Sequence, residues 1–479
     1  MEPISDPQGI RSTTFGVERS NLKLKPMSEV TELIKMHRSE KVCVIGLGYV
    51  GLTLAVALAK VGYQVIGIEK NQAIVNLTND GTPHFAETGL SALLSQVINS
   101  QNFFAVQDLK DHKPCGTYII TVGTPLNQNG IARLDMIEAA TRQVADAMPD
   151  EALIILRSTV KIGTTRNVVS PILNESGKKF EIAMCPERTL EGNAMKELHE
   201  LPQIVGADSE CTRLSAAKIF HKLTSSVIQV QGPEAAEAIK LIDNTYRDVQ
   251  FAFSNEVARL CDAFNLNAFE IISAGKLGYS RTNVPLPGPV GGPCLEKDPH
   301  ILLESAETKD IDLEITRASR LVNERLPSET AKTIKKELMN RGIEGQLKIA
   351  ILGMAFKGVP ETDDLRGSMS TKILEELRSL FPRANFMIFD PIIDVITLRD
   401  YFSNDLVCDN IWDAVRGSSL VVIANNHPKF RSIPPNAIFQ LMQPNGIIYD
   451  YWNHHSNSID RAFSNRYLAL GSLWRNENA

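Results

Sequence analysis

A single cysteine in a loop rich in glycine and proline has the setting of a chemical nucleophile. The segment GPVGGPCLEKD (288–298) contains Cys294, with Lys297 three residues later. A nearby cation favours the reactive thiolate, whereas neighbouring carboxylates oppose it. Cys185 is the rival, because it ends a predicted strand and precedes a charged Pro-Glu-Arg turn. Residue types and spacing favour Cys294 but leave both thiols open as the nucleophile.

A predicted helix carries polar residues at helical spacing. Lys240 and Asn244 are four residues apart and share one face, which Arg247 and Asp248 extend by a turn. A lysine can stabilise an alkoxide or oxyanion, and an asparagine can orient one. Taken alone, the same spacing fits a solvated polar stripe better. Chemistry at this face therefore needs support from the rest of the chain.

Polar residues also follow three predicted strands. Ligands of open α/β sheets bind beyond the carboxyl ends of the strands, so Glu187, after the strand at 180–184, could face a nicotinamide ring. A surface turn with scattered charge explains this segment equally well. The two other strands end in hydroxyl residues that could bind cofactor or water, namely Thr121, Thr124, Ser158 and Thr159.

The sequence GLGYVG at residues 46–51 is a dinucleotide-binding fingerprint between a predicted strand and a predicted helix. Its glycines allow a tight turn, close approach of a pyrophosphate, and close packing of the helix on the strand. Glu69 ends the second strand, where a carboxylate binds the adenosine ribose; this favours NAD over NADP, although Lys70 weakens the preference. The cofactor contacts predicted here are Gly46, Gly48, Tyr49, Val50, Gly51, Glu69 and Lys70.

These residues need a scaffold of parallel strands. Apolar runs alternate with helical segments, which predicts doubly wound parallel sheets. The runs lie at 41–45, 63–68, 117–122, 152–157 and 180–184, and in a second unit at 348–352, 385–389, 419–424 and 446–449. Between the units, Pro233 opens a stretch to Phe264 without further proline or glycine, which predicts one helix roughly 48 Å long.

We therefore expect an α/β protein in which a central helical domain with one long helix joins two Rossmann-like, doubly wound parallel-sheet domains. A polar N-terminal extension with a short predicted helix near 27–39 precedes them. The expected boundaries are 1–40 for the extension, 41–228 for the NAD-binding domain, 229–340 for the central domain with its catalytic loop and dimer surface, and 341–479 for the C-terminal domain.

Composition excludes several classes of protein. The 479 residues include 50 Lys plus Arg against 56 Asp plus Glu, so the net charge of −6 argues against a nucleic-acid partner. No apolar run approaches the roughly 18 residues that span a bilayer, which argues against a membrane partner, and the N-terminus has no apolar core for secretion. Seven cysteines without a CxxC pair or metal-ligand spacing favour a cytoplasmic protein and predict no metal site.

The motifs, taken in order from Val42 to Asp450, resemble the UDP-glucose/GDP-mannose dehydrogenase family. Beyond the fingerprint, the matching pieces are Ser158–Val160, Pro186–Glu187, the helix Glu237–Glu256, Gly291–Cys294 with Lys297–Asp298, and the segments LGMAFK (352–357) and DLRGS (364–368). The resemblance implies an NAD-binding Rossmann domain, a central helical domain that forms a homodimer or higher oligomer, and a C-terminal domain that binds the UDP of a UDP-sugar substrate.

The same resemblance implies a role for each site residue. The catalytic set comprises Cys294 as nucleophile, Lys240 and Asp298 as alkoxide stabilisers, Asn244 as an oxyanion contact, Glu187 as general base and Thr159 as an aid to water. The remaining cofactor contacts implied are Thr121, Thr124, Ser158, Thr159, Glu191, Lys297 and Arg366. The substrate contacts implied are Glu187, Arg188, Lys240, Asn244, Arg247, Arg281, Gly291 and Lys357.

The implied reaction is a four-electron oxidation of a sugar C6 hydroxyl to a carboxylate through a cysteine thiohemiacetal and thioester, with NAD as acceptor. The segment CPER (185–188) differs from the NPEF of the glucose-oxidising branch, and residues 246–256 are similar to the branch acting on UDP-N-acetylmannosamine. We therefore expect a UDP-N-acetylhexosamine first, UDP-glucose second and GDP-mannose third. Pro293 stands where many relatives carry histidine, which affects the detail of the loop.

Two other classes of protein compete with this interpretation. A nucleotide-sugar epimerase or dehydratase would need a Tyr-x-x-x-Lys pair, but Tyr246 is followed by Gln250 at the fourth position. A non-catalytic nucleotide-sugar sensor would not need the predicted catalytic residues, and all of them are present. Counting the NADH formed per nucleotide sugar separates the three classes.

Overall fold

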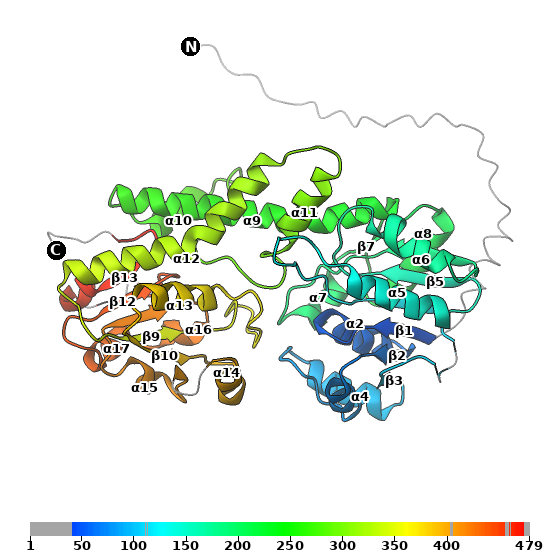
Figure 1. The fold of residues 1–479 in the computed structure, drawn as a ribbon, viewed down its shortest axis with the longest axis horizontal. Helices are drawn as coiled ribbons and strands as arrows, with labels where there is room; N and C mark the ends of the chain where they lie inside the picture. The colour runs from blue at the N-terminus through cyan, green and yellow to red at the C-terminus, as the bar shows by residue number, and fades with distance from the viewer. Residues whose placement is uncertain are drawn as a thin grey trace, which may run out of the picture.

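A computed structural model describes residues 41–473 except 111, 113, 403–405, 456–458 and 460, so the short helix predicted near 27–39 lies outside the described residues. Figure 1 shows two α/β domains side by side, the N-terminal one in blue to cyan and the C-terminal one in yellow to red. Green helices of a central domain pass above both. The predicted arrangement of two Rossmann-like domains joined by a helical domain is confirmed.

The N-terminal domain is built on an eight-stranded sheet within the described residues, in the order β3-β2-β1-β4-β5-β6-β7-β8. Its strands are β1 Lys41–Ile45, β2 Gln64–Ile68, β3 Phe103–Val106, β4 Thr117–Ile120, β5 Ala152–Leu156, β6 Phe180–Met184, β7 Gln203–Ala207 and β8 Val227–Gln231. Every neighbouring pair is parallel except β6 and β7. The strand order reverses direction beside β1 and β4, where ligands of such sheets bind.

Helices cover both faces of this sheet, as a doubly wound fold requires. One buried apolar cluster lies under α2, α4, α7 and α8, and a second lies under α5 and α6. The helices of this domain are α2 Tyr49–Lys60, α3 Gln72–Asn79, α4 Leu90–Asn99, α5 Asp135–Ala147, α6 Ser170–Asn174 after a π-helical turn at Thr165–Val169, α7 Ala194–Glu200 and α8 Glu210–Phe220.

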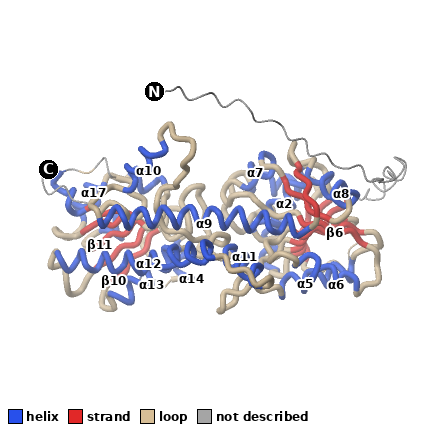
Figure 2. The backbone as a smooth tube through the Cα atoms, turned by 90° about the horizontal axis from the view of Figure 1, so that it is seen from above, coloured by secondary structure: helices blue, strands red, loops and turns tan. Residues whose placement is uncertain are grey.

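The long helix α9 spans Pro233–Ala263, so its start agrees with the prediction and its last residue lies one position before the predicted end. Gly232 precedes it with a positive φ of 79°, and Pro233 suits the first turn because its missing N–H needs no partner there. Figure 2 shows α9 running from one sheet to the other. The other helices of the central domain are α10 Ala268–Lys276, α11 Asp298–Glu307 and α12 Glu314–Asn340, and α12 packs along α9.

Side chains at both ends of α9 anchor it to the flanking domains. Near its start, the Glu237 carboxylate accepts hydrogen bonds from the backbone N–H groups of Gly163 (2.6 Å) and Thr165 (2.8 Å). Near its end, Asp262 accepts from the backbone N–H groups of Gly471 (3.2 Å) and Leu473 (3.0 Å). The helix is therefore fixed to the N-terminal domain and to the C-terminal segment of the chain.

The C-terminal domain contains a five-stranded, fully parallel sheet in the order β10-β9-β11-β12-β13 within the described residues. Its elements are β9 Lys348–Leu352, α13 Met369–Leu380, β10 Asn385–Phe389, α14 Val395–Tyr401, α15 Ile411–Val415, β11 Leu420–Ile423, α16 Pro428–Ser432, α17 Pro435–Leu441, β12 Ile447–Asp450 and β13 Tyr467–Ala469.

The same local backbone arrangement follows β1 in the N-terminal sheet and β9 in the C-terminal sheet. In the N-terminal domain Gly46 has a φ of 90°, and the next N–H, of Leu47, donates to Glu69 at 3.1 Å. In the C-terminal domain Gly353 has a φ of 91°, and the N–H of Met354 donates to Asp390 at 2.7 Å. The first strand of each sheet is thus followed by the same arrangement of a glycine and an N–H group bound to a carboxylate.

Candidate active site

The fingerprint loop has the shape that a dinucleotide requires. A Cβ atom on Gly51 would lie 1.8 Å from the carbonyl oxygen of Gly46, so only glycine allows helix α2 to pack this closely. A Cβ on Gly48 would meet no atom within 4 Å, which leaves open space at the point where a pyrophosphate approaches the backbone. Tyr49 and Val50 begin α2 and are partly buried. These residues fit NAD.

Glu69 is fixed at the carboxyl end of β2. One oxygen accepts from the N–H of Leu47 at 3.1 Å, and the other accepts from the N–H of Asn71 at 3.0 Å. Each carboxylate oxygen has a second lone pair, so the group can still bind ribose hydroxyls. Lys70 is exposed beside it. The carboxylate thus stands where the sequence places the ribose contact.

The hydroxyl residues at the strand ends bond to backbone carbonyls. Thr121 donates to the carbonyl oxygen of Gly46 at 2.7 Å, and Ser158 donates to that of Val122 at 2.6 Å. Thr124 donates to the carbonyl oxygen of Thr159 at 2.5 Å. These bonds join the carboxyl ends of β1, β4 and β5, the edge of the sheet at which ligands of such folds bind. Thr159 itself is partly buried.

Cys294 lies in the turn that precedes α11 and is exposed, unlike most cysteines among the described residues. Its carbonyl oxygen accepts from the N–H groups of Lys297 (3.2 Å) and Asp298 (2.9 Å), which makes a turn leading into the helix. A Cβ on Gly291 would lie 2.3 Å from the carbonyl oxygen of Gly367, so the catalytic loop packs tightly on the C-terminal domain. Cys294 therefore sits where the domains meet.

Charged residues from α9 and α11 surround the thiol. The buried carboxylate of Asp298 accepts from Asn244 Nδ2 and from Lys297 Nζ, both at 2.6 Å. Lys240, one turn before Asn244, is also buried. Desolvation raises the pKa of the Cys294 thiol, Lys240 and Lys297 lower it, and Asp298 raises it. Lys240 and Lys297 are therefore the groups that favour the reactive thiolate.

Arg157 and Glu187 form a buried ion pair. Arg157 Nε donates to Glu187 at 2.9 Å, a second guanidinium N–H donates to the same oxygen, and both side chains are almost fully buried. The other oxygen accepts from the N–H groups of Arg188 (2.7 Å) and Thr189 (2.8 Å). Burial alone would raise the pKa of Glu187, but Arg157 and the Thr189 amide hold it below its usual value.

Glu191 lies in a second acidic cluster, shared with the C-terminal domain. Its carbonyl oxygen accepts from Lys357 Nζ, and its carboxyl group accepts from the Thr362 hydroxyl at 3.3 Å. Burial and the neighbouring Asp364 together raise the pKa of Glu191 to about 8, against the opposing charges of Arg366 and Lys357. Arg366 forms a two-pronged ion pair with Asp364. The charge of Glu191 also acts on Cys294.

The arginines predicted to contact substrate lie in different settings. Arg188 pairs with Asp243 at 3.2 Å, which ties the CPER segment to α9. Arg247 is exposed, and its charge lowers the pKa of Lys357. Arg281 is exposed in the loop before Cys294, with its guanidinium 4.8 Å from the centre of the Tyr279 ring.

Asp248, predicted to extend the face of Lys240 and Asn244, is turned into the protein. Its carboxylate pairs with Arg320 and accepts from Asn323 Nδ2 at 2.9 Å. All three side chains are almost fully buried. The residue holds α9 against α12 and has a structural role.

Cys185, the rival nucleophile, is fully buried, and burial raises the pKa of its thiol to about 12. Its carbonyl oxygen accepts from Arg157 at 3.1 Å. A buried thiol with so high a pKa is a poor nucleophile at neutral pH. The geometry favours Cys294.

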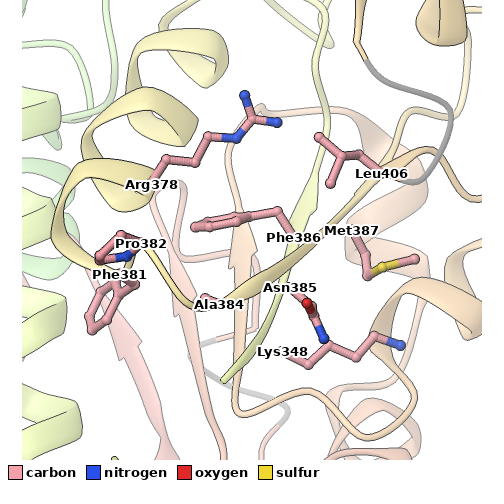
Figure 3. Close-up of a pocket in the computed structure, with 9 residues that line it drawn as sticks. All are labelled: Lys348, Arg378, Phe381, Pro382, Ala384, Asn385, Phe386, Met387 and Leu406. Atoms are coloured by element: carbon pink, nitrogen blue, oxygen red, sulfur yellow. The ribbon is translucent and has the colours of Figure 1, made fainter. Parts of the chain in front are cut away.

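Figure 3 shows a cavity of about 780 Å³ in the C-terminal domain, lined by residues that include Lys348, Arg378 and Phe386. Lys348 and Asn385 begin β9 and β10, so the cavity lies at the amino ends of the strands, opposite the edge that faces Cys294. It is separate from the candidate active site. Among the described residues, no group of His, Cys, Asp and Glu could hold a metal, and no helix is long and apolar enough to cross a membrane.

The sequence interpretation missed Arg157 and Asp364 as parts of the site. Arg157 ends a strand and Glu187 follows 30 residues later, so only the parallel neighbours β5 and β6 bring them together. A buried strand ending in arginine was the available signal, because such a charge needs a partner. Asp364 lies within a recognised motif, but nothing in its sequence neighbourhood points to Glu191.

Three family models match the chain in order. They describe the UDP-glucose/GDP-mannose dehydrogenase family and cover its NAD binding domain (residues 40–224), its central domain (234–325) and its UDP binding domain (350–457). The boundaries agree closely with the three domains seen in the structure. NAD as the cofactor, bound by the N-terminal domain, is thereby confirmed.

Individual dehydrogenases of nucleotide sugars also match most of the chain. A UDP-N-acetyl-D-mannosamine dehydrogenase of Methanococcus maripaludis is 32% identical over 440 residues, which is 90% of this chain and 97% of the relative. An NDP-N-acetyl-D-galactosaminuronic acid dehydrogenase of Ralstonia nicotianae is 30% identical over 82% of this chain and 92% of its own length.

Among solved structures, the UDP-N-acetylmannosamine dehydrogenase of Pyrococcus horikoshii superposes with a TM-score of 0.81 at 30% identity, covering 91% of this chain and 100% of the other. The superposition covers all three domains of this chain. The chain therefore belongs to the UDP-glucose/GDP-mannose dehydrogenase family and is an NAD-dependent oxidoreductase that acts on nucleotide sugars.

Proposed function

We propose that this enzyme oxidises the C6 hydroxyl of a UDP-N-acetylhexosamine, such as UDP-N-acetylmannosamine, to a carboxylate in two steps at Cys294. The observation that carries the proposal is the exposed thiol at the domain junction, flanked by Lys240 and by the Asn244–Asp298–Lys297 network. NAD, when bound, accepts a hydride from C6 in each oxidation. The overall balance is one alcohol, two NAD and one water converted to one carboxylate, two NADH and three protons.

The first oxidation converts the alcohol to an aldehyde and needs a group that stabilises the developing alkoxide. Lys240 meets this need, because it is a buried lysine that lowers the pKa of both Cys294 and Glu187. Asp298 keeps the Asn244 amide and the Lys297 ammonium in fixed positions. Donors fixed in advance stabilise an oxyanion without the cost of reorientation.

The second oxidation passes through a covalent bond to Cys294. The thiol loses its proton, the sulfur adds to the aldehyde carbon, and the resulting thiohemiacetal loses a hydride to give a thioester. Water then adds to the thioester carbon, the carbon–sulfur bond breaks, and the thiol and the carboxylate are released. Because the intermediate is covalent, the aldehyde stays in the site.

We assign the general base for the hydrolysis to Glu191 in place of Glu187. The carboxylate of Glu187 is occupied by Arg157 and two backbone N–H groups, and its lowered pKa makes it a weak base. The pKa of Glu191, raised to about 8, lies near neutral pH, where a base can both accept and return a proton. Glu187 then serves to hold Arg157 and the CPER turn.

Two observations support an N-acetylated sugar. Relatives matched over most of their length act on N-acetylmannosamine and N-acetylgalactosaminuronic acid derivatives. Arg188, which directly follows Glu187 and is held by Asp243 of α9, also has guanidinium donors that could bind an amide carbonyl.

We further propose that the enzyme is a homodimer or higher oligomer in which two copies of α9 pack together. One face of this helix exposes large apolar side chains at helical spacing, namely Ile242, Tyr246, Phe253, Leu260 and Phe264. A continuous apolar face of this kind marks an interface. Light scattering of Phe253→Asp should show dissociation, whereas unchanged mass would argue that another surface is used.

The substrate panel is the decisive experiment. UDP-N-acetylmannosamine, other UDP-N-acetylhexosamines, UDP-glucose and GDP-mannose are each incubated with NAD, and NADH absorbance is counted per mole of sugar. Two NADH per sugar support the four-electron reaction, and the preferred sugar is the one with the highest kcat/KM. No NADH with any nucleotide sugar would defeat the proposal.

Cysteine variants locate the nucleophile in the same assay. Cys294→Ser should lose the complete reaction and keep NAD binding, whereas Cys211→Ser, a cysteine of α8, should remain active. Full turnover of the Cys294 variant would refute the covalent mechanism.

A further inference from the structure

One loop of the N-terminal domain is held by the C-terminal domain. This loop 84–87 (His84, Phe85, Ala86 and Glu87) precedes α4, and the backbone N–H of Ala86 points at the Asp363 carboxylate. The nitrogen lies 3.2 Å and 3.1 Å from the two carboxylate oxygens. The partners are 277 residues apart in sequence, so the hydrogen bond exists only when the two domains are together.

From loop 84–87, contacts lead directly to the fingerprint. The ring of Phe85 stacks at a tilt on the ring of Tyr49, with 4.5 Å between their centres. Tyr49 follows Gly48 and opens α2, the helix whose N-terminus faces the cofactor phosphates. Glu87 accepts from the N–H of Gly192 at 2.7 Å, and the same N–H donates to the Tyr49 hydroxyl. A displacement of the loop would therefore move residues beside the pyrophosphate.

Asp363 belongs to a segment, residues 357–366, that also touches the substrate side of the site. Lys357 donates to the Glu191 carbonyl oxygen, and Thr362 donates to its carboxyl group. Gly192 packs so closely on this segment that a Cβ there would lie 2.5 Å from the Glu361 carbonyl oxygen. The segment follows β9, within the part of the chain matched to the family's UDP binding domain. It thus joins the NAD binding domain to the UDP binding domain.

We propose that Asp363 is a positioning residue that couples the binding of NAD to the binding of the UDP group, by holding loop 84–87 against segment 357–366. The proposal rests on UDP as the substrate's nucleotide. A ligand that orders segment 357–366 fixes Asp363, which fixes Ala86 and, through Phe85, the ring of Tyr49. Coupling of this kind is reciprocal, so NAD must tighten UDP binding by the factor with which UDP tightens NAD binding.

The test measures NAD affinity by calorimetry, with and without saturating UDP, so that turnover is not involved. In the wild type UDP should tighten NAD binding about fivefold or more. Asp363→Ala should abolish most of this factor, since the variant offers no acceptor to Ala86. Asp363→Asn should keep part of it, because an amide oxygen still accepts the hydrogen bond. Asp400→Ala, an exposed position on α14, is the matched control and should behave like the wild type.

Each outcome has a distinct meaning. Equal coupling in the wild type and Asp363→Ala, or an absence of coupling in the wild type, would overturn the role of Asp363. An equal loss of NAD affinity with and without UDP would also overturn it, since that result indicates only local damage. If UDP fails to bind the wild type at all, the nucleotide of the proposed substrate is wrong and the coupling proposal falls with it.

Discussion

Replacing Arg320 with methionine tests how the catalytic loop is supported. Arg320 lies on α12, is almost fully buried, and pairs with the buried Asp248 of α9. Its guanidinium also donates to the carbonyl oxygen of Leu295 at 3.0 Å, directly after Cys294. The variant Arg320→Met keeps the volume and removes the charge, so the Asp248 carboxylate stays buried without its cation.

Loss of one partner of a buried ion pair costs about 3–5 kcal/mol, because the remaining charge is neither hydrated nor compensated. Asn323 still donates to the carboxylate at 2.9 Å, which favours the lower part of this range. With an m-value of about 3 kcal/mol/M, the urea midpoint of the central domain should fall by about 1 M. Activity should fall as well, because the Leu295 carbonyl loses its donor.

The pH dependence identifies the cause. Burial raises the pKa of Asp248, and Arg320 and Asn323 lower it, so removal of Arg320 raises it further. The folded state of the variant then disfavours the charged form of Asp248. The variant is therefore least stable at a pH above the pKa of Asp248 in the folded state, and it regains stability as the pH falls through that pKa. The stability difference between Arg320→Met and the wild type should shrink as the pH falls through the raised pKa of Asp248.

Two controls make this prediction decisive. Adding Asp248→Asn to Arg320→Met should restore most of the stability and remove the pH dependence, because no charge is left buried. Arg317→Met removes an exposed cation from the same helix and should change stability by less than about 0.5 kcal/mol. A loss below about 1 kcal/mol in Arg320→Met, or no recovery in the double variant, would show that the buried charge is compensated in another way.

Three shorter predictions concern the cofactor and the thiol. Glu69→Ala should raise the KM for NAD about tenfold with little change in kcat, measured by steady-state kinetics, because only a ribose contact is lost. Gly51→Ala should abolish NAD binding in calorimetry, since the added methyl group would overlap the Gly46 carbonyl oxygen. The alkylation rate of Cys294 by iodoacetamide, followed by mass spectrometry, should rise with a midpoint above the pKa of a free cysteine, and Lys240→Ala should move that midpoint higher because Lys240 lowers it.

Much of the scaffold could be predicted because its signals are local. The glycines of the fingerprint and the buried runs at β1, β4 and β5 are read from neighbouring residues, and α9 was bounded to within one residue. The sequence does not predict β3, β7, β8 and β13. β3 and β13 are short, and β8 is half exposed with alternating polar residues, whereas β7 is fully buried and has no such explanation. The reversed direction of β7 relative to β6 has no marker in either strand.

The site was predicted less completely, because its decisive contacts are long-range. The ordered motifs identify Cys294, Lys240, Asn244 and Asp298 as candidates, and the charges of Lys240 and Asp298 act on the thiol. Which glutamate is free to act as a base depends on Arg157, 30 residues before Glu187 and on another strand. Pairings of this kind arise from the topology of the sheet and are invisible in the motif itself.

The two anchors of α9 also limit how this protein can change over evolutionary time. Glu237 and Asp262 hold different parts of the molecule from one continuous helix, so their angular separation around its axis is fixed. One inserted residue would turn one anchor by about 100° relative to the other and lengthen the helix by about 1.5 Å. Only an insertion of about seven residues, two whole turns, restores the angle, and it adds about 10 Å between the domains. The length of α9 should therefore be far less tolerant of insertion than the surface loops.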